Sequence, residues 1–336
     1  MSKLKVAVIG YGQIGPVHID SYKQLDDVEI AAVCDIDESR ARAAQERAGA
    51  ARYYTDYDEL LRQDDIDVIS VCIPTYLHAD CTIKAARAGK HVFCEKPMAM
   101  SIKDAEAMIE ACDKAGVKLG LGFCRRFDNQ WLKMAEIAQS GVLGDTLQWR
   151  SLSAGQGAPT PWFFDRELGG GPFMDGCVHN YDFGALMFGK VVQVRADLRT
   201  LRSGTTAKDT GTAILDYEEG HQLTLTWSWA LPAGVRTGSA HDLFGSKGVL
   251  WFQNPTRESI AVSEGHRALY VLYPDNEVKV YEYKPSAMYL EELRHFVDCV
   301  RTGATPKVGG QHGLEAARIA LAVLEAGETG KTVKLT

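Results

Sequence analysis

The sequence lacks the features that mark nucleic-acid-binding, membrane-spanning and secreted proteins. It has no cluster of lysines and arginines, and its net charge of −7 argues against a nucleic-acid partner. The first apolar run, Val6–Ile9, is too short for the core of a signal peptide, and no stretch approaches the length of a membrane span. We therefore expect a cytoplasmic protein with no membrane partner.

The eight cysteines lack the C-x-x-C spacing of common metal and redox sites. Four of them fall in or beside apolar runs that read as strands: Cys34, Cys72, Cys94 and Cys124. Free cysteine is a small and readily buried residue, so we interpret the cysteines as reduced core thiols of a reducing compartment. With 336 residues, no internal repeat and no low-complexity tract, the chain is long enough for two domains with separate cores.

The first 124 residues alternate short apolar strands with amphipathic helices. This alternation predicts an α/β fold with a parallel sheet that is covered on both faces. The expected strands are Lys5–Ile9, Glu29–Cys34, Val68–Ile73, His91–Cys94 and Lys118–Phe123. The expected helices include Asp37–Ala48, Ala79–Ala88 and Ile102–Ala115.

The first strand runs into a G-x-G-x-x-G motif, Gly10–Gly15. The motif is weak alone, but here it follows a strand and opens a predicted helix, the context of a dinucleotide pyrophosphate site. We expect Gly10 to form the tight turn, Gly12 to admit the phosphates and Gly15 to allow close helix–strand packing.

The second strand ends at Asp35, 20 residues after Gly15. An acidic side chain there can accept both ribose hydroxyls of an adenosine and would repel a 2′-phosphate, which favours NAD over NADP. Ser39 and Arg40 lie close enough in sequence to contact a phosphate if the loop bends, so NADP use stays open.

Two further strands bring polar residues to the same edge of the sheet. Pro74 and Thr75 follow the third strand, and the nearby His78 is either a base or a histidine at a helix start beside bound ribose. Glu95 and Lys96 follow the fourth. Lys96 is either a surface lysine before a turn, or a group that donates to a substrate oxygen and takes part in proton transfer.

The segment Gly169–Asp182 places Asp175 and His179 four residues apart after three glycines and a proline. If the segment is helical, the carboxylate and the imidazole lie on one face, one turn apart. From the residues alone, such a pair can orient a proton transfer or hold a metal ion.

Together, the glycine loop, Glu95-Lys96-Pro97 and the Asp175/His179 segment resemble the glucose–fructose oxidoreductase/inositol dehydrogenase/MocA family. The resemblance covers nearly the whole chain. It includes the approach to the lysine, Leu77–Cys94, and the stretch Gly122–Asp128.

The resemblance implies an NAD(P)-binding Rossmann domain over residues 1–124, with a doubly wound parallel sheet. It also implies a substrate-binding and oligomerisation α+β domain over 125–336, with a large open, mostly antiparallel sheet that supports homodimers or homotetramers. The expected second-domain strands include Thr146–Leu152, Val191–Leu201, Thr210–Tyr217, Leu223–Ala230 and Val278–Tyr283, and the expected helices Asp128–Gln139, Tyr289–Val300 and His312–Ala326. We expect the last helix to pack back on the first domain. Trp227 and Trp229 are either core or interface.

The resemblance also implies roles for individual residues. The catalytic groups map onto Lys96, Asp175 and His179, a set that explains the segment without a metal. The cofactor contacts map onto Gly10, Gly12, Gln13, Ile14, Gly15, Asp35, Pro74, Thr75, His78, Glu95 and Lys96. Substrate contacts are predicted for Arg126, Trp162 and Asn180, with Arg125 and Asp165 nearby, and Asp182 is expected to brace the segment.

The predicted function is an NAD(P)-dependent dehydrogenase of a secondary hydroxyl on a sugar or cyclitol, as in inositol dehydrogenases. One alternative is a glycoside-cleaving hydrolase or lyase that uses bound NAD transiently. Another is a non-enzymatic dinucleotide sensor, which need not keep the lysine, aspartate and histidine. The sequence does not indicate which sugar or cyclitol is the substrate.

Overall fold

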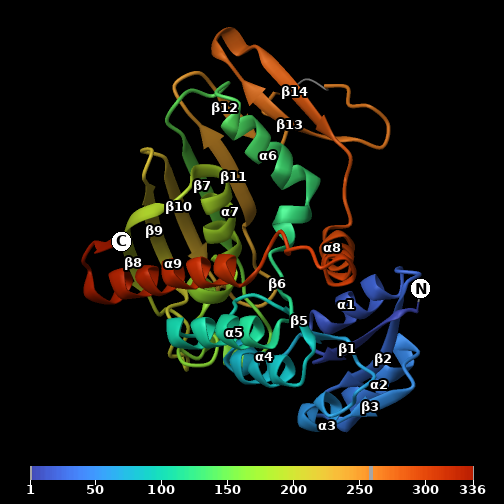
Figure 1. The fold of residues 1–336 in the computed structure, drawn as a ribbon. Coiled ribbons are helices and arrows are strands. Elements are labelled where there is room, and N and C mark those ends of the chain that lie inside the picture. Colours follow the sequence, from blue (N-terminus) through green and yellow to red (C-terminus); the bar gives the residue numbers. More distant parts are fainter. Residues whose placement is uncertain (1, 257–259, 336) are drawn as a thin grey trace. The chain divides into compact units, whose positions relative to one another are not determined.

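The branched apolar runs near the amino terminus form a six-stranded parallel sheet in the order β3-β2-β1-β4-β5-β6 (Figure 1). The structure is a computed structural model and describes residues 2–256 and 260–335. The strands are β1 (Leu4–Ile9), β2 (Val28–Cys34), β3 (Arg52–Tyr54), β4 (Val68–Val71), β5 (His91–Cys94) and β6 (Leu119–Leu121). The strand order reverses between β1 and β4, where ligands bind in open α/β sheets. The predicted parallel sheet is confirmed.

The helices of this unit follow the predicted alternation. They are α1 (Gly15–Tyr22), α2 (Glu38–Ala48), α3 (Tyr57–Leu61), α4 (His78–Arg87) and α5 (Ile102–Ala115), with one-turn helices at Thr75–Leu77 and Cys124–Phe127. Asp37 and Ser101 cap α2 and α5 by accepting a backbone N–H at each helix start, as short polar side chains do. The sequence pattern does not predict β3 or α3, because both are too short to show a clear period.

A helix from the far end of the chain completes the first unit. The helix α8 (Met288–Thr302) packs against α1, and its residues Leu293, Phe296 and Val297 are buried in the same core as β1. The unit therefore contains the chain up to Phe127 together with Ala287–Ala317. This division differs from the predicted single boundary after residue 124, because burying the apolar face of α8 outweighs its distance in sequence.

The second unit comprises Asp128–Ser286 and the chain from Arg318, and its described residues form a nine-stranded sheet. The order is β14-β13-β12-β11-β7-β10-β9-β8-β15, in which only the β7–β10 pair is parallel. The strands are β7 (Gln148–Ala154), β8 (Val191–Arg199), β9 (Thr210–Tyr217), β10 (Gln222–Ser228), β11 (Gly238–Phe244), β12 (Val249–Trp251), β13 (Arg267–Leu272), β14 (Val278–Tyr283) and β15 (Val333–Lys334). The predicted open, mostly antiparallel sheet is confirmed.

Helices cover one face of this sheet. They are α6 (Asn129–Gln139), α7 (Val178–Phe188) and the later part of α9 (Gly310–Thr329), and short helical turns occur at Pro161–Phe164, Pro172–Gly176 and Pro274–Asn276. The helix α7 lies close to the sheet at Gly184, where an added Cβ would stand 2.1 Å from the Tyr217 hydroxyl. On β7 the residues alternate between buried and exposed, with Arg150 and Leu152 on the exposed side.

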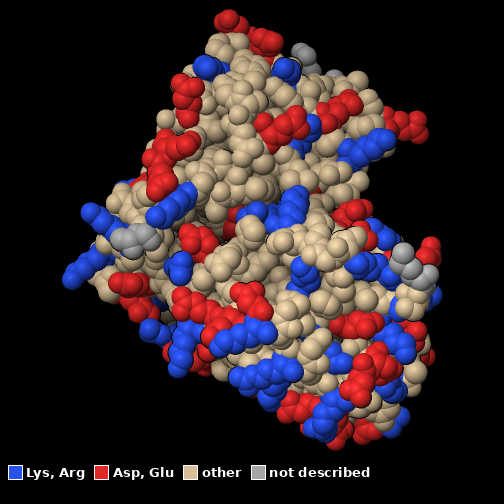
Figure 2. Space-filling model, viewed as in Figure 1, with Lys and Arg blue, Asp and Glu red and all other residues tan. Residues whose placement is uncertain are grey.

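The surface and the cysteines agree with the composition. Acidic and basic side chains are interspersed on the face drawn in Figure 2. In the part of the chain that the structure describes, no helix has the length and apolar character to cross a membrane. All eight cysteines are buried and none forms a disulfide, as expected of core thiols.

Candidate active site

The glycine loop between β1 and α1 has the geometry that the motif predicts. Gly10 has a φ of +100°, and an added Cβ would lie 2.4 Å from the Cys72 carbonyl oxygen. At Gly15 an added Cβ would lie 2.1 Å from the Gly10 oxygen, so helix and loop touch there. At Gly12, by contrast, nothing lies within 4 Å of that position, which leaves the backbone open to an approaching ligand. The loop therefore fits a dinucleotide pyrophosphate.

Asp35 lies at the end of β2 and its carboxylate binds the loop itself. One oxygen accepts the Tyr11 N–H at 2.8 Å, and the other accepts the Asp37 N–H at 3.0 Å and pairs with the Arg40 guanidinium at 2.8 Å. Arg40 keeps 52% of its side chain exposed, whereas Asp35 keeps 7%. The carboxylate is thus anchored to the loop, and the arginine is the more exposed partner of the pair.

The turn that carries Lys96 follows β5 at the carboxyl edge of the same parallel sheet. Glu95 is buried, and its carboxylate accepts from His18 Nε2 at 2.9 Å and from the Lys96 N–H at 3.2 Å. His78 is also buried, with Nδ1 2.8 Å from the Pro97 oxygen and Nε2 2.8 Å from the Ile73 oxygen. Lys96 itself is half-buried. The predicted cofactor residues Glu95 and His78 therefore brace this turn, and their contact with a cofactor stays a prediction.

The remaining predicted cofactor residues also lie at this edge. Thr75 is buried in the turn after β4, beside the half-buried Pro74, while Gln13 is exposed and Ile14 half-buried just before α1. All of these residues belong to the first unit.

Two buried carboxyl groups near the Lys96 turn differ in charge. Burial by itself raises the pKa of Glu95, but the hydrogen bond and charge of His18 and the charge of Lys96 outweigh it, and the pKa falls below its usual range. Burial and the negative charge of Glu95 raise the pKa of Glu292, on α8, well above its usual range. Glu95 therefore favours its ionised form, and Glu292 favours its protonated form. His18 and Glu292 are not among the residues predicted from the sequence, although a polar residue on the core-facing side of a helix is a signal that could have found both.

In the second unit, Asp175 and His179 lie at a junction between two kinds of helix. Asp175 is in the π-helical turn Pro172–Gly176, and His179 is the second residue of α7. The turn is closed by the Cys177 N–H, which donates to the Pro172 oxygen at 2.7 Å. Single π turns occur frequently at functional sites. The segment is thus helical, as the spacing required, but its first turn is wider than an α-helix.

Glycines let this segment lie directly on other backbone and on the sheet. Gly171, with a φ of +74°, leaves no room for a Cβ, which would stand 2.6 Å from the Lys208 oxygen. At Gly176 a Cβ would stand 2.8 Å from the Trp227 ring and 2.9 Å from the Trp229 ring. The two tryptophans therefore support the Asp175 segment from within the unit.

The predicted substrate residues occupy different environments. Asn180 is fully buried, and its amide donates to Ser151 Oγ on β7 at 3.0 Å. Asp182 is also buried, and its bracing role stays a prediction. In the first unit Arg126 is buried and Arg125 half-buried in the turn after β6.

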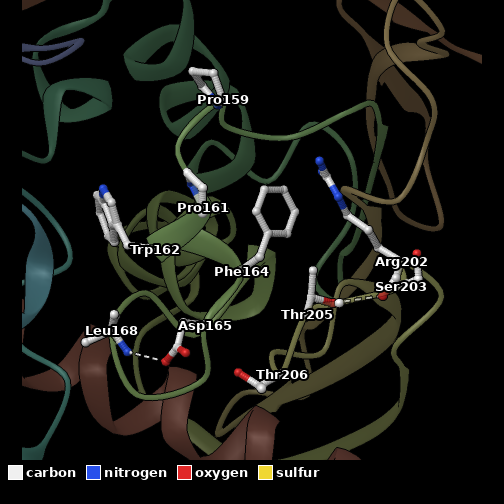
Figure 3. Close-up of a pocket in the computed structure, with 11 residues that line it drawn as sticks. Pro159, Pro161, Trp162, Phe164, Asp165, Leu168, Arg202, Ser203, Thr205 and Thr206 are labelled. Carbon is white, nitrogen blue, oxygen red and sulfur yellow. Dashed lines mark hydrogen bonds between the residues drawn. The ribbon is translucent and has the colours of Figure 1, made fainter.

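Trp162 and Asp165 line a pocket of about 440 Å³ in the second unit (Figure 3). Trp162 stacks on Phe163 with ring centres 3.7 Å apart. The Asp165 carboxylate accepts the N–H groups of Glu167 and Leu168 at 2.8 and 3.2 Å, so it braces its own loop. Arg202 lies over the Phe164 ring at 4.2 Å on the opposite wall. Trp162 and Phe164 therefore give this pocket an aromatic lining, and its Asp165 is bonded within its own loop.

Within the described ranges, no group of three or more His, Cys, Asp or Glu side chains is arranged to hold a metal ion. Burial also raises the pKa of the Cys34 thiol to about 12, which leaves it uncharged beside the cofactor loop.

Comparison with known proteins places both units in one family. Residues 4–123 match the oxidoreductase family with an NAD-binding Rossmann fold, and residues 131–251 match the GFO/IDH/MocA C-terminal domain. The chain is 32% identical to myo-inositol 2-dehydrogenase of Thermotoga maritima, over 99% of this chain and 98% of that protein. It is 26% identical to scyllo-inositol 2-dehydrogenase (NAD⁺) of Bacillus subtilis, over 91% and 89% of the two chains.

A solved structure has the same fold. Aldose–aldose oxidoreductase of Caulobacter crescentus, complexed with glycerol, matches with a TM-score of 0.84 at 28% identity, over 99% of this chain and all of that one. With the glycine loop, the acidic end of β2 and the two-unit fold, these matches show that the chain belongs to the GFO/IDH/MocA family of NAD-binding oxidoreductases, among the dehydrogenases of sugars and cyclitols.

Proposed function

We propose that this protein oxidises a secondary hydroxyl of a sugar or cyclitol with NAD, using Lys96, Asp175 and His179 as its acid–base groups. The observation that carries the proposal is the carboxyl edge of the parallel sheet. There the open backbone at Gly12 and the braced turn of Lys96 follow strands of one sheet, as a cofactor site with an adjacent catalytic group requires.

The residues of the first unit fit a bound NAD. Gly10, Gly12 and Gly15 would hold the pyrophosphate and Asp35 the adenosine ribose. When bound, the nicotinamide supplies the hydride acceptor or donor. A carboxylate fixed by two backbone N–H groups favours a ribose over a 2′-phosphate, so NAD is the proposed cofactor, with Arg40 the group that would meet NADP.

The acid–base roles follow from the chemistry of the three side chains. His179 removes the proton of the substrate hydroxyl, since an imidazole is the side chain best matched to proton transfer near neutral pH. Asp175, in the adjoining π turn, orients that imidazole or the hydroxyl. The Lys96 ammonium stabilises the negative charge that develops on the substrate oxygen.

The proposed function is tested by screening cyclitols and sugars with NAD and NADP, following the absorbance of the reduced cofactor. His179→Ala and Lys96→Met should each lower kcat about a hundredfold or more, because general acid–base groups contribute about 10²- to 10⁴-fold. NADH affinity, measured by fluorescence, should stay within roughly threefold of the wild type. Full turnover in either variant would remove that residue from the mechanism. Tightly retained cofactor with no net NADH production would favour the glycoside-cleaving alternative.

We also infer that the protein forms homodimers or homotetramers through its second sheet. The exposed side of β7 carries Leu152, which is 46% exposed, next to the Arg150–Asp242 ion pair. Such a mixed apolar and charged sheet face is suited to a second copy of the chain.

A further inference from the structure

The turn that carries Lys96 is attached to the helix that begins at the glycine loop. His18 projects from the second turn of α1, three residues after Gly15, and its Nε2 reaches the Glu95 carboxylate at 2.9 Å. The other Glu95 oxygen accepts the Lys96 N–H at 3.2 Å. One short chain of hydrogen bonds therefore joins the helix of the cofactor loop to the backbone of the catalytic lysine.

The direction of these hydrogen bonds follows from the ionised state of Glu95. A carboxylate can only accept, so His18 Nε2 carries a proton and donates it to Glu95. His18 Nδ1 lies 2.7 Å from Ser70 Oγ on β4, which fixes the plane of the ring. The imidazole is fully buried. The position of the ring is therefore set by α1, by Ser70 on β4 and by Glu95 in the turn after β5.

The surroundings leave room for the carboxylate and isolate its charge. At Gly122, after β6, a Cβ would lie 2.8–2.9 Å from the Glu95 carboxyl atoms, so any larger residue would displace them. Titratable groups from several elements interact electrostatically with Glu95. They are His18, Cys72, Cys94, Lys96, Cys124, Tyr289 and Glu292. Burial raises the pKa of the thiols and of the Tyr289 hydroxyl, so these groups stay neutral at neutral pH, and burial also raises the pKa of Glu292.

This arrangement is a costly way to fill a core. A buried ion pair is often no more stabilising than apolar residues of the same volume, because desolvation offsets the attraction. The site lies beside Phe93 and Tyr22, whose rings contact His18 at 5.6 and 6.5 Å between centres, so an apolar replacement has suitable neighbours. A role in placing Lys96 explains why the polar pair lies there.

We propose that His18 and Glu95 are positioning residues, which hold the Lys96 backbone in place relative to the cofactor loop and supply a negative charge beside the lysine. The inference rests on the proposed catalytic role of Lys96. It goes beyond that role because it assigns function to two buried side chains that need not touch substrate or cofactor.

The test uses four variants of the full-length protein. Glu95→Gln keeps the shape and removes the charge, and His18→Leu removes the donor. His18→Gln restores an N–H donor near the place of Nε2. Glu292→Gln is the matched control, because it makes the same chemical change at a second buried carboxyl, whose pKa is raised and whose oxygens have no hydrogen-bond partner among the described residues.

Glu95→Gln and His18→Leu should lower kcat roughly 10- to 100-fold, since a displacement of about 1 Å in a catalytic group costs about that much. NADH affinity should stay within roughly threefold. The pH profile of kcat should move to lower pH in Glu95→Gln, because the carboxylate that favours positive charge nearby is gone. His18→Gln should recover most of the activity, and Glu292→Gln should keep the wild-type kcat and profile.

Different results overturn different claims. If Lys96→Met retains full turnover, the proposed function loses its lysine and the positioning role fails with it. If Lys96→Met is inactive while Glu95→Gln keeps the wild-type kcat and pH profile, only the positioning role is wrong. If the pair is merely structural, substituting either residue lowers the melting temperature but leaves the pH profile of kcat in the folded fraction unchanged. In that case His18→Gln recovers no activity. If His18→Leu does not fold, Glu95→Gln and His18→Gln still decide the question.

Discussion

Replacing Gly176 with alanine tests how closely the Asp175–His179 segment must lie on its sheet. The added Cβ would stand 2.8 Å from the Trp227 ring, about 0.6 Å short of the 3.4 Å at which ordinary contact begins, and 2.9 Å from the Trp229 ring. Two rings obstruct it at once, so the segment must lift. Overpacking of this kind costs about 1–3 kcal/mol, which for a chain of this size lowers the melting temperature by roughly 2–10 °C.

The same shift should reduce catalysis more than folding. Asp175 directly precedes Gly176, and a displacement approaching 1 Å costs up to about 10² in rate, so we expect kcat to fall roughly 10- to 100-fold. NADH affinity should stay within about threefold, because the proposed cofactor contacts belong to the other unit. The matched control is Gly155→Ala, where nothing lies within 4 Å of the added Cβ. If Gly176→Ala melts and turns over like the control, the segment does not depend on this close packing.

Three further predictions concern the cofactor, pH and assembly. Asp35→Ser should weaken NADH binding at least about tenfold, because hydrogen bonds to a charged group are worth about 1.5–3 kcal/mol each. It should also reduce the preference for NADH over NADPH, and fluorescence titration with both cofactors measures the two affinities. Glu292→Gln should have the same melting temperature as the wild type near pH 4 and a higher melting temperature than the wild type near pH 8. The pKa of Glu292 is raised in the folded protein, so Glu292 loses its proton at a lower pH in the unfolded chain, and the wild type becomes less stable as the pH rises past the ordinary pKa of a glutamate. Equal melting temperatures of variant and wild type at both pH values would contradict this. Leu152→Arg should shift sedimentation toward monomers without loss of secondary structure, and an unchanged oligomer would place the interface elsewhere.

Several features of the fold could be predicted from short-range patterns. The parallel sheet followed from branched apolar runs that alternate with helices, and α5 and β9 have the predicted ends. The cofactor loop could be predicted from the spacing of three glycines. At Gly10 and Gly15 a side chain would collide with nearby backbone, and at Gly12 the backbone is open. These features depend on neighbours in sequence, which a pattern can report.

Features that depend on distant contacts could not be predicted in this way. The π turn at Pro172–Gly176 needs the support of Trp227 and Trp229, and α8 joins the first unit because its apolar face fills that core. Short strands such as β12 and β15 have too few residues to show a period and form only because a neighbour supplies the ladder.

The sequence by itself determined the family, the sheet of the first unit, the nicotinamide cofactor and the residue types of the candidate site. Only the tertiary structure decided what surrounds them. It buries Glu95 against His18, raises the pKa of the nearby Glu292 and ties Asp35 to the glycine loop. The physical reason is that charge state and orientation depend on burial and on partners brought together across the fold, and no local spacing records these.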